Sequence, residues 1–273
     1  MLIKKLLPSI RENVSLASYT SFKIGGPARY FFLAKNKDDL LKAVMAAKEL
    51  NLPFFILGGG SNLLVSDKGY KGLVIKTGES LSSYVLKGLE WAAGIPGTIQ
   101  GAVYGNAGAF GKSMKDAVES VEVFDLKTGG IKVFKNRDCK FAYRTSIFKK
   151  NKNLIIVSVK IVDEAKVSSP RITGARIKEY LNYKKDTQPL NFPSAGSVFK
   201  NPAGFSAGEL IEKCGLKGKK IGQAAISEKH ANFIVNLGKG KAKDVVGLIK
   251  LIKAKVKNKF KINLEEEIQF LGF

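Results

Sequence analysis

The stretch Ile56-Leu-Gly-Gly-Gly-Ser-Asn62 has the composition of a loop that could hold a phosphate group. Its three successive glycines leave main-chain N–H groups uncovered and permit positive φ angles. Such N–H groups can form a concave nest for a pyrophosphate, and Ser61 and Asn62 add side-chain donors. A tight turn at the end of a strand would use the same glycines. The loop lacks the Gly-Lys-Ser/Thr ending of a Walker motif and is not a G-x-G-x-x-G fingerprint.

A second stretch, residues 92–111, is dominated by glycine and alanine. Small residues at this spacing let the main chain pack closely against a large, flat partner. That partner could be a neighbouring helix or the ring system of a dinucleotide, and the sequence leaves both open.

Two more stretches place polar side chains in apolar surroundings. In Phe141-Ala-Tyr-Arg-Thr-Ser-Ile-Phe148, the charge of Arg144 must be paired, because burying it alone is very costly. A structural ion pair, or a role as anchor for a carboxylate or phosphate, would each pair the Arg144 charge.

In Pro193-Ser-Ala-Gly-Ser-Val-Phe-Lys-Asn-Pro202, the Ser197 hydroxyl follows a glycine. A serine in a loop is usually a cap or turn residue, and no Gly-x-Ser-x-Gly elbow is present.

The stretch 262–271 alternates apolar and polar residues and predicts a strand. The pattern alone places Glu267, together with Glu265, on the solvent side. The opposite face would carry Ile262, Leu264, Ile268 and Phe270. One histidine and two unclustered cysteines give no recognisable set of metal ligands, so no metal site is expected.

The elements that must position these residues follow from periodicity and turn signals. The N-terminal half predicts a β-α-β-loop-β unit with the glycine loop at a strand end. It comprises a strand at 28–34, a helix at 37–50 capped by Asn36, and strands at 54–57 and 72–76. A hairpin follows, with strands 118–124 and 131–134 around Thr128-Gly129-Gly130, and then a strand at 154–162 and a helix at 171–183.

The C-terminal part follows a predicted linker at 186–193, which contains two prolines. A helix at 206–213 is expected to begin with a capping box of Ser206 and Glu209. A strand at 231–236 and a lysine-rich helix at 242–258 complete this part before the final strand.

The composition is that of a folded, soluble protein: 273 residues, of which 45% are hydrophobic. The net charge of +23 favours anionic partners, but the lysines are scattered rather than clustered. Two cysteines without a CxxC motif fit a reducing compartment. No run approaches the ~18 apolar residues of a membrane span, and the first residues make a poor signal peptide. A cytoplasmic location is expected.

Together, the five stretches resemble UDP-N-acetylenolpyruvoylglucosamine reductase, the bacterial MurB family. The likeness extends from Tyr19 to Gly272 and is most specific at 141–148 and 193–202. It implies an α+β protein: an FAD-binding domain of the vanillyl-alcohol-oxidase (PCMH) type in two α/β subdomains at 1–188, then a smaller α+β substrate-binding domain at 189–273. Because Asp186–Pro193 leads into the serine motif without a long insertion, the chain resembles the shorter, type II form.

The resemblance also implies roles for individual residues. Ser197 matches the family's proton donor, and Arg144 and Glu267 match the pair that stabilises the intermediate. Tyr143, Lys185 and Asn201 align with substrate contacts. The cofactor segments correspond to Gly58, Gly59, Gly60, Ser61, Asn62, Pro96, Gly97, Gly101, Ala102, Asn106, Ala107, Gly108 and Ala109. The solvent-facing interpretation of Glu267 is thereby replaced, since the family would place it at the flavin.

The implied reaction is NADPH-dependent, FAD-mediated reduction of UDP-N-acetylglucosamine enolpyruvate to UDP-N-acetylmuramate in peptidoglycan precursor synthesis. A monomer is expected, without a specific nucleic-acid partner or membrane insertion. Two alternatives are another FAD oxidoreductase of the same superfamily and a non-catalytic, basic binder of nucleotides or nucleic acid.

Two features depart from the family pattern. The span 77–87 is shortened where relatives usually carry a further strand and most of a helix. Gln100 and Gly105 stand where glycine and methionine are more usual. Either departure could weaken FAD binding.

Overall fold

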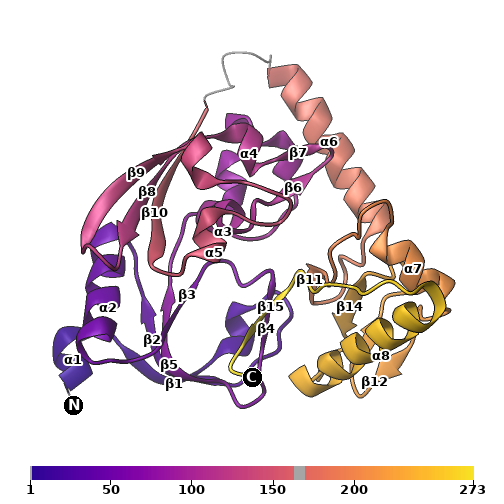
Figure 1. The fold of residues 1–273 in the computed structure, drawn as a ribbon, viewed down its shortest axis with the longest axis horizontal. Coiled ribbons are helices and arrows are strands. Elements are labelled where there is room, and N and C mark those ends of the chain that lie inside the picture. Colours follow the sequence, from indigo (N-terminus) through magenta and orange to yellow (C-terminus); the bar gives the residue numbers. More distant parts are fainter. Residues whose placement is uncertain (1, 163–169) are drawn as a thin grey trace. The chain divides into compact units, whose positions relative to one another are not determined.

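The computed structural model describes residues 2–162 and 170–273, which form mostly short helices, two long helices of 18 and 19 residues, and mostly antiparallel strands (Figure 1). The fold is α+β. The chain divides into two compact units, and each is assembled from three separate segments. Unit 1 comprises Met1–Ile10, Phe32–Gly59 and Ile75–Tyr183, and unit 2 comprises Arg11–Phe31, Gly60–Val74 and Lys184–Phe273. The domain division expected at 188/189 stays a prediction.

Unit 1 is built around the three-stranded antiparallel sheet β10-β8-β9. Its apolar core includes Trp91, Met114, Val121 and Phe148, none of which is more than 3% exposed. The helical elements are α1 (Leu2–Leu6), α2 (Lys37–Glu49), η2 (Leu81–Lys87), η3 (Glu90–Ala92), α3 (Ile99–Gly105), α4 (Met114–Ala117), η4 (Asn136–Cys139) and α5 (Ile147–Lys150). The strands are β3 (Phe54–Leu57), β6 (Gly108–Ala109), β7 (Lys112–Ser113), β8 (Val118–Asp125), β9 (Gly130–Lys135) and β10 (Leu154–Ile161). Helix α6 (Pro170–Thr187) begins in unit 1 and ends in unit 2.

Unit 2 contains the antiparallel sheet β11-β14-β13-β12 and the parallel pair β15–β4. Helix α8 packs its buried Val245, Leu248, Ile252 and Val256 into the core of this unit. The elements are β1 (Arg11–Ser15), η1 (Leu16–Tyr19), β4 (Leu63–Val65), β11 (Ser194–Ser197), α7 (Ala207–Lys213), β12 (Lys220–Ile221), β13 (Ala224–Ile226), β14 (Phe233–Asn236), α8 (Ala242–Phe260) and β15 (Gln269–Leu271). Strands β2 (Pro27–Leu33) and β5 (Tyr70–Lys76) belong to a sheet of order β1-β2-β5-β3.

Several local predictions are confirmed. Helix α2 begins after Asn36, whose side-chain oxygen accepts the Asp39 N–H at 2.8 Å. The predicted hairpin forms between β8 and β9, and Gly129 adopts φ 72° in its turn. The lysine-rich helix is α8, and Ser206 caps α7 by accepting the Glu209 N–H at 3.4 Å, which is one half of the predicted capping box.

Two predictions are wrong in part. The strand expected at 262–271 is limited to Gln269–Leu271, with one isolated bridge at Glu266. Leu264 and Ile268 are buried as the alternation requires, but Phe270 is 41% exposed. The alternating pattern therefore marks a segment with one buried side, not a continuous ladder. The linker expected from residue 186 begins later, because α6 continues to Thr187.

A side chain from a distant segment satisfies the N-terminus of α8. The Asp67 carboxylate accepts the Ala242 N–H at 2.8 Å and the Lys243 N–H at 3.1 Å. These are two of the four N–H groups that a helix leaves without internal partners, and a negative charge there is also favourable for the helix dipole. Within the described residues, no helix is both long and apolar enough to cross a membrane.

We predict that Asp67→Ala lowers the free energy of unfolding by about 1 kcal/mol, as loss of a helix cap typically does. Asp67→Asn should lose less, because one carbonyl oxygen remains. Asp38→Ala is the control, since Asp38 lies in the first turn of α2 whereas Asn36 caps that helix. Urea unfolding measures all three variants, and an equal loss in Asp67→Ala and Asp38→Ala would contradict the capping role.

Candidate active site

Within unit 2, Ser197 and Glu267 are held next to each other by the main chain. Ser197 is the last residue of β11 and pairs with Phe233 of β14. The following residue, Val198, accepts the Glu267 N–H on its carbonyl at 2.8 Å. Both Ser197 and Glu267 are half-buried. The predicted proton donor and the predicted carboxylate thus come from segments 70 positions apart (267 − 197) that one hydrogen bond joins beside them.

Asn62 ties the glycine loop to the same segment. Its carboxamide nitrogen donates to the Glu267 carbonyl at 3.1 Å, and the main-chain carbonyl of Asn62 accepts the Gln269 N–H at 3.0 Å. Gly60, two residues earlier, adopts φ 64°, and a Cβ there would lie 2.1 Å from the Tyr19 carbonyl oxygen. This part of the loop therefore needs glycine for packing, and the Asn62 side chain fixes the main chain at Glu267.

The two predicted substrate contacts in unit 2 lie at helix ends. Lys185 is exposed near the end of α6, and its carbonyl accepts from the Lys229 ammonium. Its neighbour Lys184 is buried, and burial lowers the pKa of Lys184 to about 8. Asn201 is exposed, and its side-chain oxygen accepts the Ala207 N–H at 3.0 Å at the start of α7.

Within unit 1, the remaining glycines of the loop pack directly on the small-residue stretch. A Cβ at Gly59 would lie 2.3 Å from the Gly97 Cα, and one at Gly58 would lie 2.6 Å from the Thr98 hydroxyl oxygen. Thr98 in turn caps α3 by accepting the Gly101 N–H at 3.2 Å. Gly59, Pro96 and Gly101 are exposed, and Gly58 and Gly97 are half-buried. Two segments thus bring together a partly accessible stretch of main chain at four glycines. We call it the ledge, and it consists of Gly58, Gly59, Gly97 and Gly101.

The far end of this stretch supports the turn that carries Arg144. Asn106, with φ 46°, ends α3; its carboxamide donates to the Ala142 carbonyl and accepts the Lys115 N–H, each at 2.9 Å. The buried Ser146 hydroxyl donates to the Tyr104 carbonyl at 2.7 Å. The other predicted cofactor residues here are Ala102, which is buried, and Ala107, Gly108 and Ala109, which are half-buried.

Tyr143 and Arg144 are the two central residues of a tight turn. Ala142 and Thr145 exchange two main-chain hydrogen bonds of 3.0 and 3.1 Å across it. Arg144 has φ 54°, in the left-handed region where glycine or asparagine is usual. Tyr143 is 55% exposed, and the Arg144 guanidinium lies 5.4 Å from the centre of its ring. An arginine in a strained conformation is typical of a position whose side chain has a function.

Gln100 and the shortened span 77–87, which both depart from the family pattern, are in contact. The Gln100 side-chain oxygen accepts the Glu79 N–H of the shortened 77–87 span at 3.0 Å. The Tyr84 hydroxyl donates to the Glu79 carboxylate at 2.6 Å; burial, with Glu79 adding to it, raises the pKa of Tyr84 to about 12. Gln100 therefore helps to hold the short span in place. Gly105 has open space where a Cβ would be.

The structure also identifies a residue that the sequence motifs did not indicate. Asn232 is 4% exposed and bonds to both main-chain groups of Phe199. The only sequence signal is an asparagine within the otherwise apolar run Ala231–Val235, because a buried carboxamide must be hydrogen-bonded. Among the described residues, no cluster of three or more His, Cys, Asp or Glu side chains is arranged to hold a metal ion.

We predict that Arg144→Gly is more stable than Arg144→Ala by about 1 kcal/mol, because only glycine adopts φ > 0 without steric cost. Both variants lose the guanidinium, so their difference isolates the backbone conformation. At exposed Lys42, within α2, the order should reverse, since alanine is the better helix former by about 1 kcal/mol. Thermal unfolding of the four variants tests this, and an alanine advantage at residue 144 would exclude strain in the turn.

Comparisons with known proteins match this chain to one enzyme family. The model of the "UDP-N-acetylenolpyruvoylglucosamine reductase, C-terminal domain" family matches residues 188–271. The chain is 41% identical to the UDP-N-acetylenolpyruvoylglucosamine reductase of Caldanaerobacter subterraneus, over 100% of this chain and 98% of the relative. It is 42% identical to the protein of the same name from Caldicellulosiruptor bescii, over 94% of this chain and 89% of the relative.

A solved structure extends the likeness to three dimensions. The UDP-N-acetylenolpyruvylglucosamine reductase (MurB) of Thermus caldophilus superposes with a TM-score of 0.79 at 34% identity, covering 96% of this chain and 99% of that one. Identity at this level over nearly the whole length of each chain establishes common descent, so this chain belongs to the UDP-N-acetylenolpyruvoylglucosamine reductase family.

Proposed function

We propose that this chain reduces UDP-N-acetylglucosamine enolpyruvate to UDP-N-acetylmuramate, with FAD as bound cofactor and NADPH as reductant. Its full-length relatives carry the name of that reductase. The observation that carries the residue-level proposal is the hydrogen bond from the Glu267 N–H to the Val198 carbonyl, which sets Glu267 beside Ser197. No described feature favours the other flavin oxidoreductases or the non-catalytic nucleotide binder.

The ledge formed by Gly58, Gly59, Gly97 and Gly101 fits a cofactor with a pyrophosphate and a flat ring system. Gly58, Gly59 and Gly97 carry no side chain that would cover their N–H groups, and anions bind in nests of such groups. The Gly101 N–H is already donated to the Thr98 hydroxyl, so Gly101 contributes only its lack of a side chain. We assign cofactor binding to this ledge together with Gly60, Ser61, Asn62, Pro96, Ala102, Asn106, Ala107, Gly108 and Ala109. When bound, FAD supplies the hydride that adds to C3 of the enolpyruvyl group.

Arg144 and Glu267 are proposed to stabilise the charge that then develops on the substrate. Negative charge at C2 spreads into the neighbouring carboxylate, and a guanidinium can meet that carboxylate with two parallel N–H donors. Preorganised donors of this kind contribute typically ~3–4 kcal/mol each. A bare Glu267 carboxylate would repel the charge, so Glu267 acts in its protonated form or by orienting a donor.

Ser197 is proposed to deliver the proton to C2. A hydroxyl is a weak acid, but a carbanion-like carbon is a strong base, so the transfer is chemically reasonable. Ser197 is half-buried, with the Val198 and Phe199 side chains behind it almost fully buried. Part of Ser197 therefore remains accessible, while the two buried residues that follow it anchor its main chain.

The remaining assignments follow the family more closely than the geometry. Tyr143, Lys185 and Asn201 are proposed substrate contacts, and all three are exposed. Lys185 and Asn201 carry polar groups suited to a diphosphate. We assign residues 1–188 to an FAD-binding domain of the vanillyl-alcohol-oxidase type in two α/β subdomains and residues 189–273 to the substrate-binding domain. A cytoplasmic monomer completes the proposal.

We predict that the flavin is bound non-covalently. The one histidine, His230, has its Nδ1 occupied by the Asn232 N–H at 3.2 Å. Cys139 is buried, and burial, with some help from Asp138, raises the pKa of its thiol to about 11, which disfavours the reactive thiolate. Acid denaturation followed by ultrafiltration should leave all yellow colour in the filtrate. Colour retained with the polypeptide would show a covalent bond.

We predict that Ser197→Ala leaves reduction of FAD by NADPH nearly unchanged and slows reoxidation by the enolpyruvyl substrate ~10²–10⁴-fold, the usual loss when a general acid is removed. Only the second half-reaction needs a proton at C2. Stopped-flow absorbance at the flavin band follows each half separately.

Ser194→Ala is the matched control for this experiment. Ser194 begins the same strand, β11, is also half-buried, and its hydroxyl accepts the Gly196 N–H at 3.5 Å. It should keep both rates near those of the wild type. Equal slowing of the two half-reactions in Ser197→Ala would mean that Ser197 has a structural role only.

A further inference from the structure

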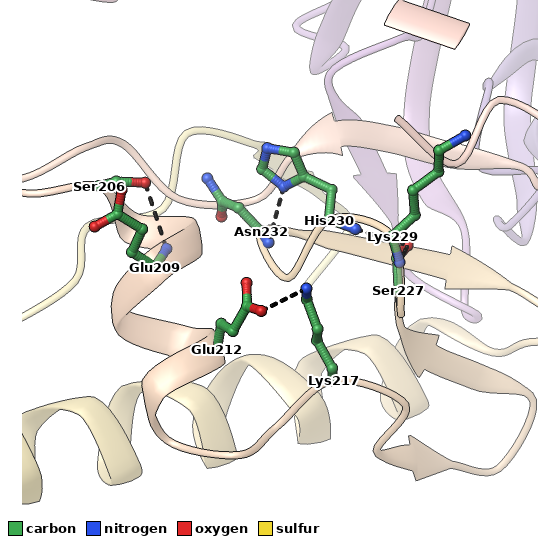
Figure 2. A network of polar contacts seen from close by, with 8 residues as sticks. All are labelled: Ser206, Glu209, Glu212, Lys217, Ser227, Lys229, His230 and Asn232. Atoms are coloured by element: carbon green, nitrogen blue, oxygen red, sulfur yellow. Dashed lines mark hydrogen bonds and ion pairs between the residues drawn. The ribbon is translucent and has the colours of Figure 1, made fainter. Parts of the chain in front are cut away.

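Asn232 lies in the turn before β14, two residues after His230 (Figure 2), and its side chain bonds to Phe199, two residues after Ser197. Its side-chain oxygen accepts the Phe199 N–H at 2.9 Å, and its side-chain nitrogen donates to the Phe199 carbonyl at 2.8 Å. One carboxamide thus satisfies both main-chain groups of Phe199, as a residue of a neighbouring strand would. Asn232 is only 4% exposed, so these bonds are shielded from water.

The main chain of Asn232 adds two further bonds to this arrangement. Its carbonyl accepts the Val198 N–H at 2.8 Å, and its N–H donates to the His230 Nδ1 at 3.2 Å. The pairing of β11 with β14 ends at Ser197 and Phe233, after a shift in register. Asn232 therefore continues the ladder where the two strands themselves no longer pair.

His230 helps to fix the conformation of this turn. Its main-chain N–H and that of Lys229 both donate to the Ser227 hydroxyl, at 3.3 and 3.1 Å (Figure 2). The imidazole packs against Phe233, with ring centres 4.8 Å apart. Burial lowers the pKa of His230, which favours the neutral ring whose Nδ1 can accept from Asn232. The turn thus presents the Asn232 carboxamide in one orientation.

On the other side, the residues that follow β11 are bonded to the segment of Glu267. The Val198 carbonyl accepts the Glu267 N–H at 2.8 Å, and the Lys200 N–H donates to the Glu265 carbonyl at 2.9 Å. If the strand shifted along its axis, Ser197 would move relative to Glu267. The bonds from Asn232 oppose such a shift, because they fix the two residues that follow Ser197.

We propose that Asn232 is a positioning residue for proton delivery: by fixing Val198 and Phe199, it holds the Ser197 hydroxyl in the place that the reaction requires. This inference rests on the proposed function, in which Ser197 protonates the substrate. Asn232 itself touches neither substrate nor cofactor in this scheme. A displacement of about 1 Å at a reacting group can cost on the order of 10²-fold in rate.

Asn232→Ala tests this proposal in the FAD-loaded protein. Reoxidation of reduced flavin by UDP-N-acetylglucosamine enolpyruvate should slow ~10–100-fold, since the proton donor is misplaced rather than removed. Reduction by NADPH should change less than about twofold, because that half-reaction requires no proton from Ser197.

Asn236→Ala is the matched control, because Asn236 is equally buried and lies at the other end of β14. Its carboxamide donates to the Phe22 carbonyl at 3.0 Å and accepts the Gly238 and Gly240 N–H groups at 2.9 and 2.8 Å. It makes none of the bonds to residues 198 and 199. Both variants should lose comparable thermal stability, but only Asn232→Ala should show the difference between the two half-reactions.

Amide hydrogen exchange gives a second readout that does not depend on turnover. The Val198 and Phe199 amides should exchange faster in Asn232→Ala and remain protected in Asn236→Ala. If Asn232→Ala fails to fold, Asn232→Ser, which keeps a small polar group and introduces no buried charge, should show the same selective effect.

The outcomes separate this inference from the proposed function. Wild-type flavin that the enolpyruvyl substrate does not reoxidise would refute the proposed function, and the exchange data would still decide whether Asn232 holds the strand. A wild-type reoxidation rate in the Asn232 variants, or equal slowing by Asn232→Ala and Asn236→Ala, would overturn the positioning role.

Discussion

The candidate site depends on the hydrogen bonding, on two sides, of the short segment 197–200 that begins at the last residue of β11. One side is bonded to the turn at Asn232, and the other to the segment at Glu265–Glu267. The bonding partners on the two sides come from different parts of unit 2. Both are therefore needed to fix the position of Ser197. Asn62 then extends the bonding from Glu267 to the glycine loop. Buried hydrogen bonds of this kind are costly to leave unmade, and the cost opposes any slip in register.

In unit 1, the main chain at the glycine loop is accessible and also closely packed. Gly58 and Gly59 contact Gly97 and Thr98 so closely that a Cβ on either glycine would collide. The contact itself makes the glycines necessary, and it also keeps side chains away from the accessible ledge. Gln100 supports the neighbouring span through Glu79, so the shortened segment is held by a bond that the usual glycine at that position would not provide.

Much of the architecture could be predicted because its determinants are local. Asn36 and Thr128-Gly129-Gly130 act within a few residues of themselves, and the helix and hairpin they indicate are present. The final strand was predicted too long, because alternation reports burial on one side but not hydrogen-bond partners. Asn232 could not be assigned from the sequence, since its partner Phe199 is 33 positions away and no motif links them. The strain at Arg144 was equally invisible, because residue type does not reveal φ.

The discontinuity of unit 2 has a consequence for how the protein is made. Strand β15 pairs in parallel with β4, and Asn62 bonds to Glu267 across a separation of 205 positions. Contacts this distant in sequence form slowly, since a long loop must close before they contribute. At a synthesis rate of 5–20 residues per second, the early partner waits on the order of 10–40 s for the late one. During that time, apolar Leu63, Leu64 and Val65 lack the strand that later covers their edge. The nascent chain is therefore exposed to misassembly for longer than a protein built from contiguous domains.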